Sequence, residues 1–358
     1  MALRLTIFAF KYSSMIQRIV LFLIIAFFFI RCSDNQEEKC ETVPDVSGIS
    51  IDLTFDQSQD SLPALKSKED LVRFLAKNPV LRDIFFNRTS YPDDSVFINK
   101  LYSRFNNPAF DTLLSETHKV FGDGSELKSE FQQAFTNLKF YYPDFQPPKI
   151  QFVITGLESD IFVSDSLVIV GLDYFIGPGA KYKPNMYEYM QRRYQKNFVV
   201  PSVLLLYGID YRFNKTDVKE SNVLADMVSY GKAYSFAKHM LPCTPDSVLI
   251  GYTQEELTGS RKNESLIWSR LIEDQVLYAT SHLIKQKYID ERPKTIEVGE
   301  KCPGRIGTWI GWQMIRKYEE TYPDESFTRI MNMPSPEKIF RDSGYKPQII
   351  QLKKAEKV

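Results

Sequence analysis

The side chains that most often carry out catalysis are sparse in this sequence and follow no known catalytic pattern. The chain has only three histidines, His118, His239 and His282, and none has a histidine neighbour at the spacing that places two zinc ligands on one helix face. The patterns His-Glu-x-x-His, Gly-x-Ser-x-Gly, Walker A and Gly-x-Gly-x-x-Gly do not occur in the sequence. We therefore expect no catalytic residue, no metal ligand and no cofactor, and we interpret the protein as a non-enzyme.

Cys32 is the residue that we expect to carry a lipid. It follows residues 19–30, an uninterrupted apolar run of 12 residues with Arg18 as its positive flank. Such a run is too short to cross a hydrocarbon layer, which needs about 20 apolar residues, and is typical of a signal peptide. A cysteine at its end looks like a lipoprotein signal, although Arg31 replaces the usual small residue. An uncleaved signal anchor is the alternative, and Met15 is an alternative start of translation.

The other cysteines are Cys40, Cys243 and Cys302, and none forms a Cys-x-x-Cys pair. A zinc site or a thioredoxin-type site is therefore not expected. One disulfide is compatible with an oxidising compartment. Cys243 with Cys302 is the pair that we predict, and two buried free thiols are the alternative.

Composition along the chain predicts one folded domain behind a membrane anchor. We expect a signal peptide over residues 1–31, a lipidated polar tether over 32–62 and a single globular domain over 63–350, followed by a flexible basic tail over 351–358. The tether is rich in Asp, Glu, Ser and Gln, and we expect one short strand in it, over 49–55.

Helical periodicity and capping signals dominate the domain. Capping residues precede apolar stripes at four places, and between them residues 149–155 and the pair 161–163 and 167–170 have strand patterns, with a turn at Ser164-Asp165. The fold class that we predict is α+β and mostly helical, with a small antiparallel sheet in the middle. The four capping residues are Ser67, Asn107, Asn222 and Thr253.

A late helix that starts after Pro303-Gly304 has the most unusual residues. Gly307 and Gly311 lie four apart, and because glycine weakens a helix by up to about 1 kcal/mol, this spacing predicts a close crossing with another backbone. Trp309 and Trp312 flank these glycines, and we expect them to pack in the core. Arg305 occupies a helix start, which is unfavourable for a cation, so we expect it to pair with a buried acid such as Glu273 or to bind a partner.

The charge balance gives no support for a nucleic-acid partner. Lys plus Arg and Asp plus Glu both number 45, whereas phosphate binding requires a basic face. Partners are therefore expected to be the membrane and other proteins. A Tyr-rich helix over about 185–196 is a second place, besides Arg305, where exposed aromatic side chains are expected.

Several segments taken together resemble the gliding motility lipoprotein B family (GldB) of Bacteroidetes. They are Tyr230-Gly231-Lys232-Ala233-Tyr234, Ile250-Gly251-Tyr252-Thr253, residues 164–179, and Pro303-Gly304-Arg305-Ile306-Gly307-Thr308-Trp309-Ile310-Gly311-Trp312-Gln313. The resemblance implies a cell-envelope lipoprotein needed for surface gliding and associated with the gliding and type IX secretion apparatus. It implies a location outside the cytoplasm, and the family provides no catalytic residues to carry over.

A more distant likeness is to zinc metallopeptidase-like domains of the gluzincin type. In those domains a Glu-Gly-x-Ala motif provides a zinc ligand, whereas here Tyr230 stands at the glutamate position, before Gly231, Lys232 and Ala233. The two histidines and the general base that such a site requires are also missing. The likeness implies a degenerate, zincin-like scaffold without its metal.

Three functions are compatible with the sequence. The first is a non-enzymatic envelope lipoprotein that binds proteins of the motility or secretion machinery, and it predicts an exposed apolar or aromatic patch near residues 182–194 and Arg305. The second is a cryptic metallopeptidase-like hydrolase with a deep polar pocket. The third is a ligand-binding or glycan-binding envelope lipoprotein with an open aromatic groove.

Overall fold

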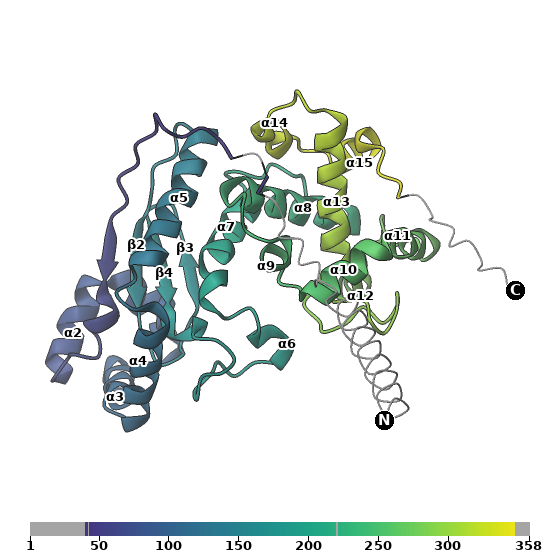
Figure 1. Cartoon of the computed structure of the whole chain (residues 1–358). Helices are drawn as coiled ribbons and strands as arrows, with labels where there is room; N and C mark the ends of the chain where they lie inside the picture. The colour runs from purple at the N-terminus through teal and green to yellow at the C-terminus, as the bar shows by residue number, and fades with distance from the viewer. Residues whose placement is uncertain (1–39, 42, 220, 348–358) are drawn as a thin grey trace, which may run out of the picture. The chain divides into compact units, whose positions relative to one another are not determined.

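A mixed four-stranded sheet forms one side of the fold, and a pair of crossing helices forms the other (Figure 1). The computed structural model describes residues 40–41, 43–219 and 221–347. The expected signal peptide, Cys32 and the C-terminal tail lie outside the described residues. The sheet consists of β1 (Phe55–Gln57), β2 (Lys149–Val153), β3 (Ile161–Val163) and β4 (Leu167–Gly171).

The predicted hairpin is confirmed, but the sheet is not wholly antiparallel. The strand order is β1-β2-β4-β3, in which β3 and β4 are antiparallel and β2 is parallel to both β1 and β4. The parallel pairs set Phe55 opposite Ile150, and Ile150 opposite Val168. β2 and β4 are the two central strands of the sheet. Their residues are mostly buried, as expected for strands that are covered on both faces.

The N-terminal half is otherwise helical, as the capping signals predicted. Ser67 caps α2 and Asn107 caps α4, each through its side chain, because their oxygens accept backbone N–H groups of the first turn. These helices are α2 (Lys68–Lys77), α3 (Asp94–Phe105), α4 (Pro108–Phe121) and α5 (Ser125–Tyr141). Short turns of other helix types are η1 (Ser58–Asp60), η2 (Leu81–Phe85), η3 (Arg88–Ser90), η4 (Leu172–Phe175) and η5 (Lys196–Phe198).

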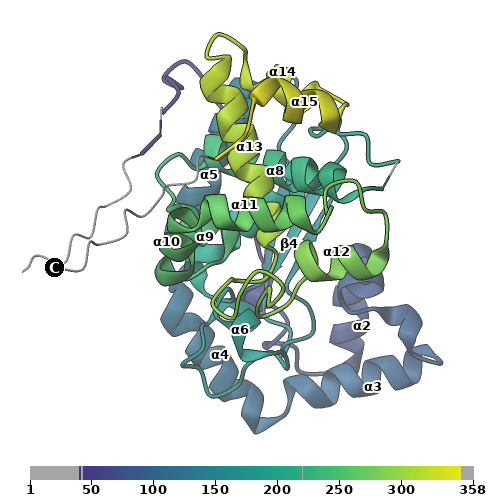
Figure 2. The ribbon, with the colours of Figure 1, turned by 90° about the vertical axis from the view of Figure 1, so that its right-hand side faces the viewer.

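The C-terminal half is built around α8 (Val223–Met240) and α13 (Ile306–Thr321), which cross (Figures 1 and 2). The mostly helical α+β class is therefore confirmed. Asn222 caps α8, and Thr253 with Glu256 forms the predicted capping box of α10. The remaining helices are α6 (Glu188–Gln191), α7 (Val199–Ile209), α9 (Asp246–Ile250), α10 (Gln254–Lys262), α11 (Glu264–Glu273), α12 (His282–Tyr288), α14 (Phe327–Asn332) and α15 (Pro336–Ser343).

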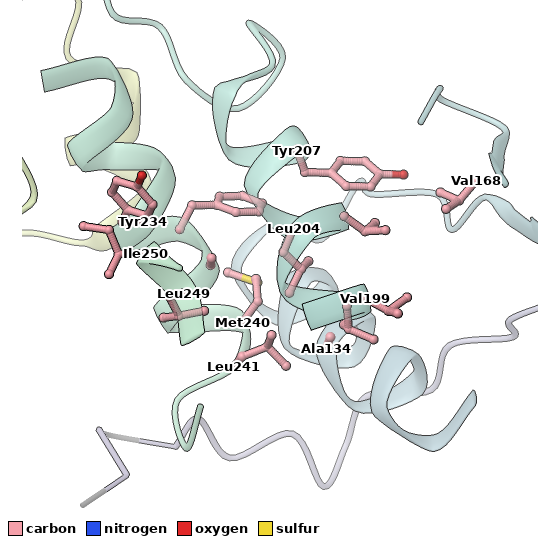
Figure 3. Close-up of a cluster of buried hydrophobic side chains, with 14 of the residues drawn as sticks. Ala134, Val168, Val199, Leu204, Tyr207, Tyr234, Met240, Leu241, Leu249 and Ile250 are labelled. Carbon is pink, nitrogen blue, oxygen red and sulfur yellow. The ribbon is translucent and has the colours of Figure 1, made fainter. Parts of the chain in front are cut away.

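The core links the two halves through α7. This helix contacts β3 and α5 on one side and α8 on the other. Figure 3 shows side chains from α5, α7, α8 and α9 meeting there, among them Ala134, Leu204, Met240 and Leu249, all buried. Burying an aliphatic side chain of this size contributes roughly 1.5–3 kcal/mol, so this cluster joins the sheet to the crossing helices.

The close crossing predicted from Gly307 and Gly311 is confirmed for Gly311, which meets α8, whereas Gly307 approaches the backbone of Tyr288 at the end of α12. A Cβ added to Gly311 would lie 1.8 Å from the carbonyl oxygen of Met227 on α8, and one added to Gly231 would lie 2.4 Å from the carbonyl of Gly311. Only glycine therefore permits the two backbones to approach this closely.

Two expectations about the chain before α2 are wrong. Residues 49–62 were expected to belong to a tether, yet β1 joins the sheet and Leu53 and Leu62 are buried. The predicted disulfide is also wrong, because Cys243 is bonded to Cys40 and Cys302 is free. The sequence separation of 203 between Cys40 and Cys243 explains the error, since no local pattern reports a pairing over that distance.

Candidate functional site

Arg305 is held in a strained backbone conformation at the start of α13. It is the N-cap residue and has a left-handed φ of 58°. A non-glycine residue in this region costs roughly 1–2 kcal/mol, and such residues often mark functional sites. Its side chain holds it there, because Nη2 donates to the carbonyl oxygen of Ile250 at 2.8 Å and Nε lies 3.4 Å from Oε2 of Glu291.

Arg305 pairs with Glu291. The prediction that Glu273 is its partner is therefore wrong. Glu273 instead pairs with Arg270 on its own helix, 3.6 Å away. The same Oε2 of Glu291 accepts a hydrogen bond from Nη2 of Arg193 at 2.8 Å. One carboxylate is thus shared by two guanidinium groups.

Two tyrosines complete the surroundings of Arg305. Its Nη1 donates to the hydroxyl of Tyr234 at 3.3 Å, and its guanidinium lies 5.8 Å from the ring centre of Tyr252, in cation–π range. Burial opposes the charge of Arg305, but Tyr234 and Glu291 outweigh that effect and raise its pKa. Arg305 therefore remains a cation in this half-buried position.

The two arginines lie at an apolar cavity of about 470 Å³, a volume within the range of small-ligand and side-chain pockets. Its apolar wall comes from β3, the turns η4 and η5, and helices α6, α7 and α9. The wall includes Phe175, Met190, Phe198, Leu205 and Val248, while two acids and two arginines provide the charged side: Asp160, Glu291, Arg193 and Arg305. Asp160 accepts a hydrogen bond from the hydroxyl of Tyr194 at 2.8 Å.

The segment predicted as a Tyr-rich helix borders this cavity. Only Glu188–Gln191 is helical, and none of these four residues is buried, so the segment has no apolar face that would hold a longer helix. Tyr187 is 75% exposed, and its ring stacks on that of Tyr189 with 5.9 Å between centres. The two regions that the sequence singled out separately, residues 182–194 and Arg305, therefore meet at one site.

The other residues singled out from the sequence occupy the α8–α13 crossing. Tyr230 is 37% exposed on α8, and burial raises its pKa. Lys232 is fully buried, and its Nζ donates to the carbonyl oxygen of Met333 at 2.6 Å. Trp309 and Trp312 are buried in the core. None of these four residues lines the cavity, whereas Arg305 does.

Sequence reasoning missed Glu291 and the contact between Gly251 and Arg193. Glu291 lies in an irregular loop after α12, where no periodicity distinguishes it from a solvated acid. Gly251 ends α9 with a φ of 72°, and a Cβ there would lie 2.4 Å from Cδ of Arg193. A glycine directly after a short apolar run is a signal for such a turn, but not for the arginine that packs on it.

The residues present do not fit a zinc ion. Within the described part of the chain, no group of three or more His, Cys, Asp and Glu side chains is close enough together to hold a metal. Tyr230, at the position of the expected glutamate ligand, provides a phenol with a raised pKa rather than a carboxylate.

Comparisons with known proteins identify one family. The sequence model described as gliding motility protein GldB matches residues 39–347, which is most of the chain. No curated protein and no solved structure matches. Among the described residues, no helix combines the length and apolar character that a membrane crossing requires.

Proposed function

The chain belongs to the gliding motility protein GldB family, and from that premise we propose that it is a non-enzymatic envelope lipoprotein that binds another protein of the gliding machinery at the cavity beside Arg193 and Arg305. Membership of this lipoprotein family implies a location in the cell envelope. A lipid on Cys32 and an association with the type IX secretion apparatus are further parts of the proposal.

The shared carboxylate is the observation that carries this proposal. Tyr and Arg are enriched among the residues that dominate protein–protein binding energies, particularly where a cavity excludes water. Arg193 and Arg305 have one carboxylate between them, and an apolar cavity lies beside them. The chemistry that fits is a protein segment with an apolar side chain, which enters the cavity, next to a carboxylate, which the two guanidinium groups bind.

Gliding of cells that carry an Arg193→Gln variant tests the proposal. Arg193 contacts Glu291 but does not cap a helix, so the substitution removes a charge and leaves Arg305 in place. We expect binding to weaken by about 2 kcal/mol, roughly 30-fold in affinity, and gliding to be strongly reduced. The measurement is cell displacement on a surface in a strain whose own copy is deleted.

Arg82→Gln is the matched control, because Arg82 also pairs with an acid, Asp83, on a part of the chain outside the cavity. We expect this variant to restore gliding fully at an equal protein level. Normal gliding of Arg193→Gln cells at a wild-type protein level would argue against the cavity as the partner site.

The exposed Tyr187–Tyr189 stack favours glycan binding as a second candidate, since sugar rings pack on exposed aromatic faces. A glycan ligand predicts that a broad oligosaccharide panel raises the melting temperature, and that Tyr187→Ala abolishes the shift. The partner proposal predicts no shift with any glycan.

A metallopeptidase-like hydrolase remains the other alternative. Elemental analysis of the purified protein separates it from the main proposal. We expect no stoichiometric zinc. Zinc at one equivalent per chain would favour the hydrolase over the partner-binding proposal.

A further inference from the structure

The first described residues are fastened to the domain at three points. Cys40 is bonded to Cys243, the backbone N–H of Glu41 donates to the carbonyl oxygen of Pro242 at 3.1 Å, and Oε1 of Glu41 lies 3.3 Å from Nη2 of Arg316. These contacts involve the connection between α8 and α9 and the last turns of α13. The chain therefore enters the domain at one fixed place.

That place lies at the opposite end of α13 from the cavity. Arg305 caps the beginning of the helix, whereas Arg316 lies 11 residues later, roughly 17 Å along the axis. Figures 1 and 2 show α13 running toward α14, away from α10 and α12.

The chain before this place is short. Cys32 precedes Cys40 by eight residues. Even when fully extended, a segment of eight residues spans at most about 29 Å. A domain of some 300 residues has a radius of gyration of about 19 Å. An anchor at Cys32 therefore keeps the surface around Cys40 close to the bilayer, since the rest of the domain cannot pass through it.

We infer that the Cys40–Cys243 disulfide sets the orientation of the protein on the membrane. The Cys40 face, lined by Cys40, Glu41, Tyr141, His239 and Tyr322, lies against the bilayer surface, and the end of α13 that holds Arg305 projects away from it. The inference rests on the proposed membrane anchoring at Cys32, but not on the nature of the partner.

The aromatic side chains of the Cys40 face suit a bilayer surface, and the same face also has three carboxylates, those of Glu41, Glu319 and Glu325. Tyr322 and Phe140 are 37% and 40% exposed. Phe140 packs edge-to-face on Tyr141, which lines the same cavity as Tyr322 and His239. Aromatic residues with one polar end are enriched at the level of lipid headgroups.

Loss of the disulfide lengthens the tether. The next side chain after Cys40 that packs against the core is that of Ile51. Once the exposed contacts of Glu41 also open, the chain between the anchor and the first packed residue grows from eight to 19 residues. Its maximum span then rises from about 29 Å to about 68 Å, which permits the domain to rotate.

Lipid crosslinking of the full-length protein in vesicles of phosphatidylethanolamine and phosphatidylglycerol tests this orientation. The photoreactive residue p-benzoylphenylalanine replaces Tyr322 in one variant and Tyr187, beside the cavity, in the other. We expect several-fold more lipid adduct, measured by mass spectrometry, at position 322 than at 187. In the double variant Cys40→Ser/Cys243→Ser the two yields should become similar.

Equal yields at the two positions in the disulfide-bonded protein, or a higher yield at 187, would overturn the inference. This comparison needs only the disulfide-bonded protein, so it stands even if the double variant does not fold. Vesicle flotation tests the anchoring separately, and protein that does not float would overturn both the anchor and the orientation. No partner protein is present, so the result is independent of the cavity's role in binding.

Discussion

Arg305 and Lys232 are both shielded from solvent, but their charges have different surroundings. Arg305 keeps its charge because a carboxylate and two tyrosines lie around it, whereas among the described residues Lys232 has only the carbonyl oxygens of Met331 and Met333 within hydrogen-bond distance. Burial without a counter-ion lowers the pKa of Lys232 to about 7. A buried lysine with this pKa makes stability depend on pH.

We expect Lys232 to make the protein more stable as the pH rises from 7 to 10. Its pKa is 10.5 in the unfolded chain and about 7 in the folded one, so in this range only the unfolded state holds the proton. The free energy of unfolding should therefore rise by up to about 1.4 kcal/mol per pH unit from this group, and the contribution should be constant below pH 7.

Lys232→Met removes this contribution, because methionine does not titrate. Urea unfolding of both proteins at several pH values measures it as the difference between wild type and variant, in which the other titrating groups cancel. A difference that stays constant from pH 7 to 10 would show that Lys232 does not titrate in this way.

At the residue scale, sequence reasoning found the unusual residues but not their partners. Arg305 stands out because a cation at a helix start is unfavourable. Its partner Glu291 lies 14 residues away in a loop, and Arg193 lies far from both in the sequence. Contacts between distant segments bring these three side chains together, because Arg305 donates to the carbonyl oxygen of Ile250 and Arg193 packs on Gly251.

At the element scale, the crossing of α8 and α13 is the feature with the clearest sequence signal. Glycines four residues apart in a helix with an apolar stripe predicted it, and the Gly311–Met227 approach confirms it. The parallel pairing of β1 with β2 had no comparable signal, because these strands are joined through four helices and short apolar runs do not report their partners.

We expect Gly311→Ala to destabilise the protein by at least about 2 kcal/mol, since the new methyl group would overlap the carbonyl of Met227 and force the helices apart. Gly259→Ala in α10 is the control, because a Cβ there meets nothing within 4 Å. It should stabilise the protein by up to about 1 kcal/mol. Thermal unfolding measures both, and equal effects would refute a tight crossing.

At the scale of the whole molecule, the Cys40–Cys243 disulfide closes a loop of some 200 residues. Crosslinks over long loops stabilise proteins by about 2–5 kcal/mol, chiefly by restricting the unfolded chain. We expect a reducing agent to lower the melting temperature by several degrees. Cys40→Ser should abolish this response, whereas Cys302→Ser should retain it because Cys302 is free. A wild-type protein that melts at one temperature with and without reductant would contradict this.

For the molecule as a whole, family membership adds a link to function that the geometry alone does not provide. Capping signals and periodicity are local and therefore gave the helical α+β class, while the disulfide, the sheet order and the Arg193–Glu291–Arg305 cluster all depend on contacts between distant segments. The family match connects this fold to gliding motility. The cavity then indicates where on the molecule a partner would bind.

The most direct test of the cavity as a binding site is site-specific crosslinking in cells that glide. The residue p-benzoylphenylalanine replaces Leu206, which is 44% exposed and lines the cavity, or Ile84, which is 56% exposed outside it. We predict that the probe at 206 captures one envelope protein, that Arg193→Gln in the same chain removes the adduct, and that the probe at 84 does not capture it. Equal capture of that protein at both positions, or an adduct at 206 that persists in the Arg193→Gln variant, would contradict a partner site at this cavity.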